Sequence, residues 1–257
     1  MKITVITITF NAEKVLSPTL QSVFRQTHND VEHWIIDGAS KDGTLKIAEE
    51  YKRHDDSTDN GHEVHILSEP DSGIYFAMNK GLERATGSYV LFLNAGDTLA
   101  SNDTLDEVCA SIGDGEELPA VIYGDTDIVD ADYHFIRHRR LAPPKHLTWK
   151  SFLHGMLVCH QAFYARADIA KDIPYDTQYR HSADVDWCIK VLKEGRRRHL
   201  PNRRVHAVVA NFLDGGDTTR NHRDSLRERF QVMRHHYGII PTLAMHAWFV
   251  IRGIIKK

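Results

Sequence analysis

The stretch Ser88–Asp97 reads SYVLFLNAGD, a strongly apolar run that ends in polar and very small residues. Tyr89–Leu93 predicts a buried strand, and the residues that follow predict a turn. Hard divalent cations prefer oxygen ligands, and they usually reach diphosphates through one or two carboxylates. Asp97, at the end of this strand, is therefore a candidate metal ligand, with a plain helix N-cap as the alternative.

Strand-like and helix-like segments alternate on the N-terminal side of this stretch. We expect strands at 2–9, 32–37, 64–68 and 88–94, and helices at 17–26, 43–53 and 74–85. This alternation predicts an α/β fold, in which helices flank a mostly parallel central sheet and ligands bind at the carboxyl ends of the strands. Further on, the pattern predicts helices at 103–112 and 185–194 and strands at 120–123, 158–166 and 204–212.

The composition is that of a folded globular protein. The chain has 257 residues, of which 42% are apolar and 26% are charged, so disorder and a disulfide scaffold are excluded. Cys109, Cys159 and Cys188 are odd in number and lack CxxC spacing, which favours reduced thiols and a cytoplasmic location. The start, residues 1–10, resembles a strand more than a signal peptide.

Charge is distributed unevenly along the chain. The total of −3 combines +9 from Arg196 onward with −12 before it. Residues 238–257 are rich in isoleucine and carry a few basic residues, but they fall short of the ~20 consecutive apolar residues of a membrane span. We interpret them as an amphipathic helix on an anionic membrane surface. Packing of this helix on the protein's own core or on a partner subunit remains the alternative.

A second carboxylate, Asp37, ends the strand 32–37 and precedes Gly38, Ala39 and Ser40. A carboxylate there can accept a hydrogen bond from a nucleobase or a ribose. An Asx turn that leads into the next helix explains the same residues equally well.

Five spaced motifs give a more specific result. They are TFNAE at 9–13, SVFRQT at 22–27, IDGASKDGT at 36–44, SEPDSGIY at 68–75 with AMNKG at 77–81, and ATG at 85–87 before the turn 94–97. Their order resembles that of family 2 glycosyltransferases, in particular the bacterial polysaccharide-assembly branch that is similar to the colanic acid transferases. The resemblance is strong over about the first hundred residues and continues in shorter islands to about Gly216.

This resemblance implies a GT-A fold, with a transferase domain at 1–216 and a basic helical tail at 217–257. The nucleotide-binding half would be 1–100 and the acceptor half 101–216. By similarity, the donor nucleotide would be bound by Thr9, Asn11, Asp37, Asp71, Asn94 and Asp97. UDP-sugars are favoured as donors, and GDP-sugars stay open.

The resemblance also implies Mg²⁺ or Mn²⁺ as cofactor. The family's aspartate-rich metal motif falls on residues 94–97, where Asn94 and Gly96 replace carboxylates and only Asp97 remains. Asp184 takes the position of the family's catalytic base, at a place where Ala183 replaces the usual preceding glutamate. A helix N-cap is the structural alternative for Asp184.

Three further features follow from the resemblance. His160 and Gln161 resemble a His-Gln segment that is expected near the sugar or the acceptor. Gly215 and Gly216 match a glycine pair in a mobile loop over the donor. Arg220 and Arg223 follow this pair and could approach the diphosphate.

The leading hypothesis is an inverting glycosyltransferase that transfers a sugar to a saccharide acceptor in surface polysaccharide synthesis. The basic and apolar C-terminal residues favour an acceptor that is linked to a lipid. We expect it in the cytoplasm, or peripherally on the inner face of the cytoplasmic membrane. The alternative is a nucleotide-sugar-binding protein without catalysis. A nucleic-acid-binding protein is disfavoured because only the basic C-terminal part supports it, and a dehydrogenase because no GxGxxG follows the first strand.

Overall fold

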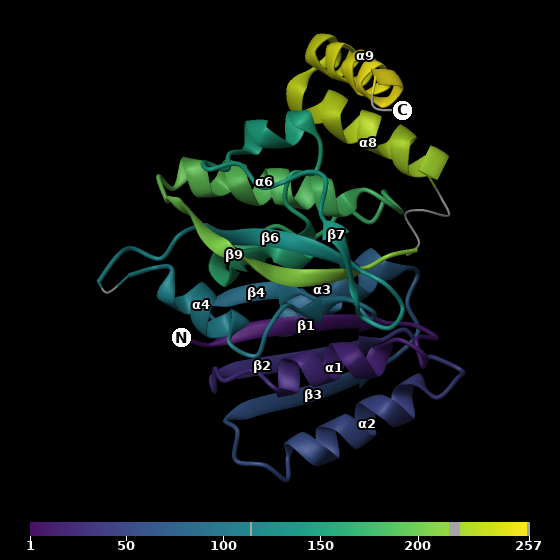
Figure 1. Cartoon of the computed structure of the whole chain (residues 1–257), viewed down its shortest axis with the longest axis vertical. Helices are drawn as coiled ribbons and strands as arrows, with labels where there is room; N and C mark the ends of the chain where they lie inside the picture. Colours follow the sequence, from purple (N-terminus) through teal and green to yellow (C-terminus); the bar gives the residue numbers. More distant parts are fainter. Residues whose placement is uncertain (114, 216–221, 256–257) are drawn as a thin grey trace.

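The computed structural model describes residues 1–113, 115–215 and 222–255. Its strands join in a single mixed sheet of order β3-β2-β1-β4-β8-β6-β9-β5, with β7 paired to β6 (Figure 1). The strands are β1 (Ile3–Thr9), β2 (Val31–Asp37), β3 (His62–Ser68), β4 (Tyr89–Phe92), β5 (Thr98–Leu99), β6 (Val121–Val129), β7 (Phe135–His138), β8 (Phe163–Arg166) and β9 (Asn202–Leu213).

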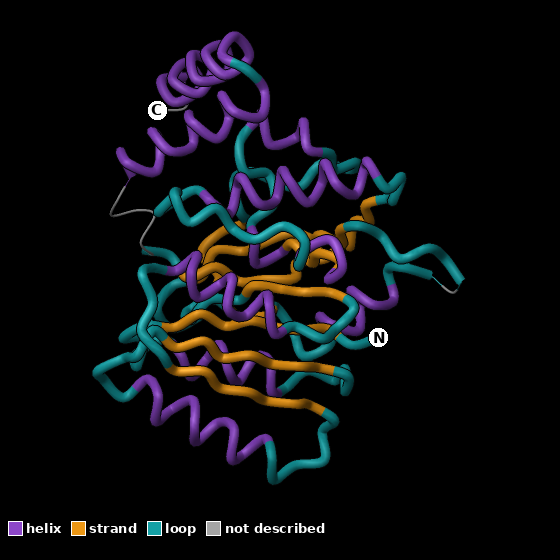
Figure 2. Tube along the Cα trace, turned by 180° about the vertical axis from the view of Figure 1, so that it is seen from behind, coloured by secondary structure: helices purple, strands orange, loops and turns teal. Residues whose placement is uncertain are grey.

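Helices cover both faces of this sheet and extend beyond it at one end (Figure 2). The α-helices are α1 (Leu16–Phe24), α2 (Thr44–Asp55), α3 (Ile74–Arg84), α4 (Thr104–Ala110), α5 (Ala167–Ala170), α6 (Ala183–Arg197), α8 (His222–Tyr237) and α9 (Ile239–Ile255). Two short 3-10 helices are η1 (Trp149–His154) and η2 (His160–Ala162). The predicted α/β class, with helices flanking a central sheet, is therefore confirmed.

The β3-β2-β1-β4 half is parallel throughout. Alternate residues of β2 face opposite layers: Ile35 packs with α1 and α2, whereas Ile36 packs toward α3. Gly81 allows α3 to approach the sheet closely, because a Cβ there would lie 2.5 Å from a methyl carbon of Ile6 and 3.3 Å from a side-chain carbon of Ile36. Both faces of this half are covered, so its central strands β1, β2 and β4 are almost wholly buried.

The other half is mixed. β8 runs antiparallel to β4 and β6, and β9 runs parallel to β6. An aromatic stack connects α3 to α6: Tyr175 lies 5.6 Å from Tyr75 and 4.9 Å from Trp187 between ring centroids. The stack fixes the start of α6 relative to the ends of the parallel strands.

Two local predictions are wrong. The predicted strand 158–166 is reduced to β8, because residues 160–162 form η2. The helix expected to end at Gly195 continues to Arg197. Gly195 is required by packing instead of capping, since a Cβ there would lie 2.4 Å from the Cβ of Ala120.

The C-terminal helices α8 and α9 pack together above α6 (Figure 1). α8 is fastened to the segment before α6: the Glu228 carboxylate accepts hydrogen bonds from the backbone amides of Arg180 and His181, at 2.9 and 2.7 Å. The Ser182 hydroxyl donates to the Ser225 carbonyl at 3.2 Å. α8 therefore helps to position the first residues of α6.

Burial of His33 in β2 predicts acid sensitivity of the fold. Its ring is bonded to the hydroxyls of Thr7 and Tyr51, each at 2.9 Å, and burial lowers its pKa from 6.5 to about 3, with help from the nearby His62. Between these two values the unfolded chain binds a proton that the folded protein excludes. The free energy of unfolding should therefore fall, by up to ~1.4 kcal/mol per pH unit, as the pH decreases from 6.5 toward 3.

Urea unfolding of the wild type and of His33→Gln at several pH values measures this effect. The variant keeps hydrogen-bonding groups but does not titrate, so its stability should depend less steeply on pH. Parallel pH dependences in the two proteins would show that His33 is not the acid-sensitive group.

Candidate active site

Three polar side chains meet where the parallel strands end. Thr9, Asp37 and Ser68 are neighbours in register on β1, β2 and β3. Asp37 is 1% exposed and accepts hydrogen bonds from the Ser68 hydroxyl at 2.6 Å and from the amide and hydroxyl of Ser40. The Thr9 hydroxyl is buried without a partner among the described residues. The predicted Asx-type turn is thus present, at the sheet edge where a nucleotide was expected.

Asn11 joins two loops at this edge. Its side-chain oxygen accepts a hydrogen bond from the Lys41 amide at 2.9 Å, and its own amide donates to the Ser40 hydroxyl at 2.8 Å. Its φ of +48° is unusual for a residue with a side chain. In this structure Asn11 therefore shapes the loop after β1, and its side-chain oxygen is occupied within the protein.

Phe10 is a candidate that the sequence analysis missed. Its ring is 63% exposed although it lies beside Gly38, where a Cβ would be 3.2 Å from the ring and 3.0 Å from an Asp71 carboxylate oxygen. Phe10 and Asp71 thus flank the turn after β2. An exposed aromatic directly after a strand was the available signal, because a flat ring can stack on a nucleobase.

The turn after β4 is joined to the start of α6 through η2. His160 lies between Asn94 and Asp184: its Nε2 is 3.1 Å from the Asn94 side-chain nitrogen, and its Nδ1 is 3.5 Å from an Asp184 carboxylate oxygen. His160 therefore links the side chains of Asn94 and Asp184 through its two ring nitrogens. These three predicted residues come together although they are far apart in the sequence.

Asp97 and Gln161 form a second connection beside the first. The Gln161 side-chain amide donates a hydrogen bond to one carboxylate oxygen of Asp97 at 2.6 Å. The backbone amide of Leu213 donates to the other Asp97 oxygen at 3.1 Å. Burial raises the pKa of Asp97 to about 6, although these bonds and the charge of His160 oppose the rise. Asp97 precedes β5, so the alternative of a helix N-cap is excluded.

Asp184 is held in its ionised form. Burial alone would raise the pKa of its carboxyl, but the hydrogen bond and charge of His160, followed by the charge of Arg229, hold this pKa below its usual value. The Tyr75 hydroxyl and the Val185 amide donate to one carboxylate oxygen, at 3.4 and 2.9 Å. The N-cap of α6 is Ser182, so Asp184 is not the capping residue.

Two cavities meet at His160 and Asp184. The strand-end cavity, of about 270 Å³, is also lined by Tyr75, Asn94 and Asp97. The arginine cavity, of about 550 Å³, is also lined by Arg137, Arg139, Arg140, Arg229 and Phe249. A carboxylate that is ionised and accessible from both cavities can remove a proton from a hydroxyl that enters from one side and reacts with a group on the other.

Asn94 and Asp97 could together hold a divalent cation that takes only one or two of its ligands from the protein. The Asn94 side-chain oxygen is buried without a partner within the described ranges and belongs to the wall of the strand-end cavity. Asp97 adds a carboxylate, although both its oxygens accept internal hydrogen bonds. Magnesium is commonly bound through one or two protein oxygens together with substrate phosphates and water. This donor set suits such binding.

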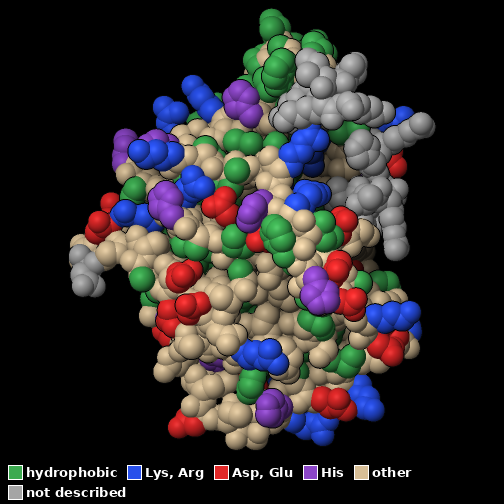
Figure 3. All heavy atoms as spheres, in the orientation of Figure 1, with side chains coloured by type: hydrophobic (Ala, Val, Ile, Leu, Met, Phe, Trp, Pro, Cys, Tyr) green, Lys and Arg blue, Asp and Glu red, His purple; other side chains and the backbone are tan. Residues whose placement is uncertain are grey.

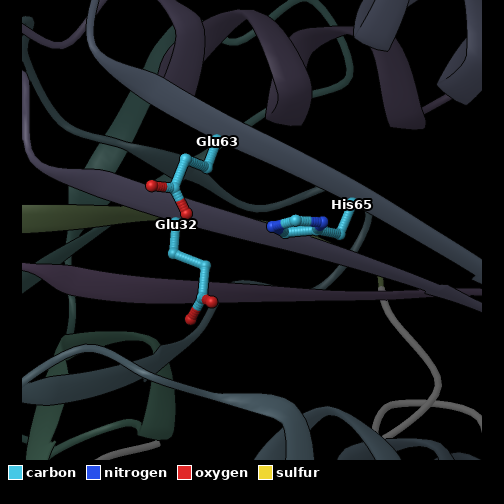
Figure 4. Close-up of side chains that lie close together, drawn as sticks. All are labelled: Glu32, Glu63 and His65. Carbon is cyan, nitrogen blue, oxygen red and sulfur yellow. The ribbon is translucent and has the colours of Figure 1, made fainter.

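Within the described ranges, two clusters of acidic and histidine side chains are close enough together to hold a metal ion, and both lie outside the strand-end cavity. One consists of Glu32, Glu63 and His65 on β2 and β3 (Figure 4), and the other of Asp130, Asp132 and His134. The Glu32 carboxylate accepts hydrogen bonds from Thr4 and Thr86. Lys2 forms an ion pair with Glu63 at 2.7 Å. Internal bonds therefore explain the cluster of Figure 4 without a metal.

The loop after β9 is described in part. Gly215 has a φ of +88°, a conformation that favours glycine. Gly216 and Arg220, two other predicted positions, lie outside the described residues, and the side chain of Arg223 is not described. The side chain of His236 is 3% exposed and lies 2.7 Å from a carboxylate oxygen of Asp186, to which it is hydrogen-bonded.

Known proteins share both the sequence and the fold. The model of Glycosyl transferase family 2 matches residues 4–173. A PGL/p-HBAD biosynthesis glycosyltransferase of Mycobacterium tuberculosis is 34% identical over 209 residues, which is 81% of this chain and 75% of the relative. TuaG of Bacillus subtilis, a glycosyltransferase provisionally assigned to teichuronic acid biosynthesis, is 40% identical over 95 residues, 37% of this chain and 36% of TuaG.

Solved structures agree on the fold. Residues 1–349 of TarS from S. aureus, in complex with UDP-GlcNAc, align with a TM-score of 0.71 at 20% identity over 91% of this chain, which spans 65% of that one. The mannosyltransferase PcManGT from Pyrobaculum calidifontis, in complex with GDP-Man and Mn²⁺, aligns with a TM-score of 0.64 at 17% identity over 96% of this chain and 68% of that one. Together, the family match and the 34% identical relative show that this chain belongs to glycosyl transferase family 2.

Proposed function

We propose that the protein transfers a sugar from a nucleoside diphosphate donor to a saccharide acceptor, with inversion at the anomeric carbon. The observation that carries this proposal is the meeting of two cavities at the His160–Asp184 pair. The donor sugar would occupy the strand-end cavity, beside the expected nucleotide site at Thr9 and Asp37. The acceptor would enter through the arginine cavity.

In this mechanism Asp184 is the general base. Its carboxylate takes the proton from the acceptor hydroxyl while that oxygen attacks the anomeric carbon and the bond to the nucleoside diphosphate breaks. The Nδ1 of His160 orients the carboxylate and helps to keep it ionised. A divalent cation held by Asp97 and Asn94 would neutralise charge on the leaving diphosphate. Direct displacement by the acceptor requires inversion.

UDP-sugars are the favoured donors, and GDP-sugars remain an option, since TarS binds UDP-GlcNAc and PcManGT binds GDP-Man. A thermal-shift panel of UDP, GDP and their sugars, with and without Mn²⁺, tests donor binding. One nucleotide class should raise the melting temperature, and Mn²⁺ should increase the shift. Absence of any shift would contradict the proposed donor class.

A nucleotide-sugar-binding protein without catalysis is the second candidate. The engagement of both Asp97 oxygens by Gln161 and Leu213 favours it, because a metal ligand must be free to bind. An assay for nucleoside diphosphate release decides between the two candidates. It uses the nucleotide sugar that raises the melting temperature in the thermal-shift panel. Release that depends on Asp184 excludes a purely binding role.

We also propose that α9 docks on an anionic membrane and brings the enzyme to a lipid-linked acceptor. One face of α9 is exposed and apolar, with Ile240 at 79%, Leu243 at 54% and Trp248 at 50% exposure, whereas Thr242 on the opposite face is buried. Hydrophobic side chains gather at this end of the molecule, with basic ones nearby (Figure 3). The charge of +9 from Arg196 onward complements anionic headgroups.

No helix in residues 1–113, 115–215 and 222–255 is both long enough and apolar enough to cross a bilayer. Interfacial binding by α9 can be tested with the full chain on vesicles. The wild type should sediment with vesicles that contain anionic lipid, and less with zwitterionic ones. Ile240→Asp should weaken this binding roughly tenfold or more, because a charge replaces an apolar side chain that would insert into the lipid.

Leu118→Asp is the matched control, since Leu118 is also an exposed apolar residue (38%) but lies in the loop before β6. It should bind vesicles like the wild type. If Ile240→Asp leaves sedimentation unchanged, α9 does not dock on lipid. If Ile240→Asp instead dissociates a dimer, the face is an interface between two copies.

A further inference from the structure

The arginine cavity carries more positive than negative charge. Arg137, Arg139, Arg140 and Arg229 line it, whereas its acidic residues are Asp184 and Asp214. Among the described residues, none of these four arginines forms an ion pair with a carboxylate within 4.0 Å. Four positive charges around one cavity, balanced in part by two carboxylates, repel one another, so a bound anion would stabilise them.

The guanidinium groups are also positioned. Arg139 is held by backbone carbonyls: it donates to Met156 at 2.6 Å and to Leu141 at 2.8 Å. The Nε of Arg229 is buried and has no hydrogen-bond partner among the described residues. α8 fixes the backbone of Arg229, because the neighbouring Glu228 binds the segment before α6. Buried donors without partners are costly, so the Arg229 side chain, which lines this cavity, has a hydrogen-bonding requirement that the described residues do not meet.

The same cavity has an apolar wall next to α9. Leu141, Met156, Phe212 and Phe249 contribute to it. Phe249 belongs to α9 and reaches the cavity from the helix whose opposite face is exposed and apolar. A ligand in this cavity therefore meets the His160–Asp184 pair, several arginines and an apolar wall within one continuous space.

We propose that these arginines bind a phosphate or diphosphate group of the acceptor, which links the acceptor sugar to an apolar chain. This inference rests on the proposed function, because it assigns the acceptor to the arginine cavity. Arginine suits the task, since its planar guanidinium binds phosphate oxygens through two parallel hydrogen bonds. The donor diphosphate is expected in the other cavity, beside Asn94 and Asp97.

Binding of an alkyl diphosphate to the full chain tests this proposal without any need for turnover. Calorimetry would be done with farnesyl diphosphate, inorganic pyrophosphate and farnesol, each in the presence of saturating UDP and, in a second series, saturating GDP. Farnesyl diphosphate should bind despite the nucleotide, inorganic pyrophosphate should bind more weakly, and farnesol should bind weakest. Equal binding of the two diphosphates would show that the site recognises phosphate alone and would overturn the lipid part.

Two variants reduce the positive charge of the arginine cavity, one at a half-buried arginine and one at two exposed arginines. Arg229→Gln removes a half-buried guanidinium, whose Nε is buried, and Arg137→Gln/Arg140→Gln removes two exposed ones. Each should weaken farnesyl diphosphate binding roughly tenfold to a hundredfold, because hydrogen bonds to charged groups are lost. Arg203→Gln is the control, since Arg203 pairs with Glu116 outside this cavity, and it should bind like the wild type.

Competition identifies the site. If UDP or GDP abolishes farnesyl diphosphate binding, the anion occupies the donor site and the inference is wrong. Unchanged binding in both arginine variants would also overturn it. Failure of the proposed function looks different, because no nucleotide sugar would release nucleoside diphosphate while alkyl diphosphate binding persists.

Discussion

Asp184→Asn should abolish sugar transfer and leave the donor bound. The amide keeps the size of the carboxylate but cannot accept the proton of the attacking hydroxyl, so kcat should fall by about 10³-fold, within the range that general bases contribute. The affinity for the nucleotide, measured by calorimetry, should change little, because Asp184 lies at the junction of the cavities and not beside Thr9 and Asp37.

Asp186→Asn is the matched control on the same helix. Asp186 is 1% exposed and bonded to His236 and Lys190 on the side away from the cavities. This substitution should lower the free energy of unfolding while the folded protein keeps its kcat. An Asp184→Asn variant that retains a tenth or more of wild-type kcat would exclude Asp184 as the base.

Asp97→Asn should have the second largest effect. The substitution removes the remaining carboxylate of the strand-end turn, and with it the negative charge that a divalent cation requires. We expect kcat/KM to fall by about 10²-fold and the dependence on Mn²⁺ to shift to higher concentration. Gln161 can still donate to the amide oxygen, so the fold around η2 should remain intact. An undiminished response to Mn²⁺ would place the metal elsewhere.

The pH profile provides an independent measurement of Asp97. With its pKa raised to about 6 by burial, Asp97 is ionised above that pH and protonated below it. Wild-type kcat/KM should therefore decrease as the pH falls through about 6, and this limb should be absent from the residual activity of Asp97→Asn. Gln161→Met removes a bond that lowers the pKa of Asp97, so the limb should move to higher pH. An identical limb in all three proteins would assign it to another group.

The parallel half of the sheet was predictable because it depends on local pattern. Strand-like and helix-like segments alternate along the chain there, and the carboxyl ends of parallel strands meet at one edge. The placement of Asp37, Asn94 and Asp97 at this edge was therefore predictable from sequence. The contact of His160 with Asp184 was not, because it depends on how η2 and α6 approach across the mixed half of the sheet.

Other features depend on packing that no local pattern records. Gly195 follows a helical segment, as a capping glycine does, yet its role is to let α6 approach Ala120. Arg229 belongs to a basic stretch that the sequence assigns to a tail. The hydrogen bonds of Glu228 to the segment before α6 help to bring Arg229 near the Asp184 carboxylate.

The anomeric configuration of the released sugar is a direct test of displacement assisted by Asp184. In the absence of an acceptor, water can take the place of the attacking hydroxyl and slowly hydrolyse the nucleotide sugar that binds best. Proton NMR can identify the anomer that is released before the free sugar interconverts between its two anomers. Direct displacement predicts that the first anomer formed has the configuration opposite to that of the donor, and that Asp184→Asn does not form this anomer. Release of the sugar with the donor's own configuration would contradict direct displacement assisted by Asp184.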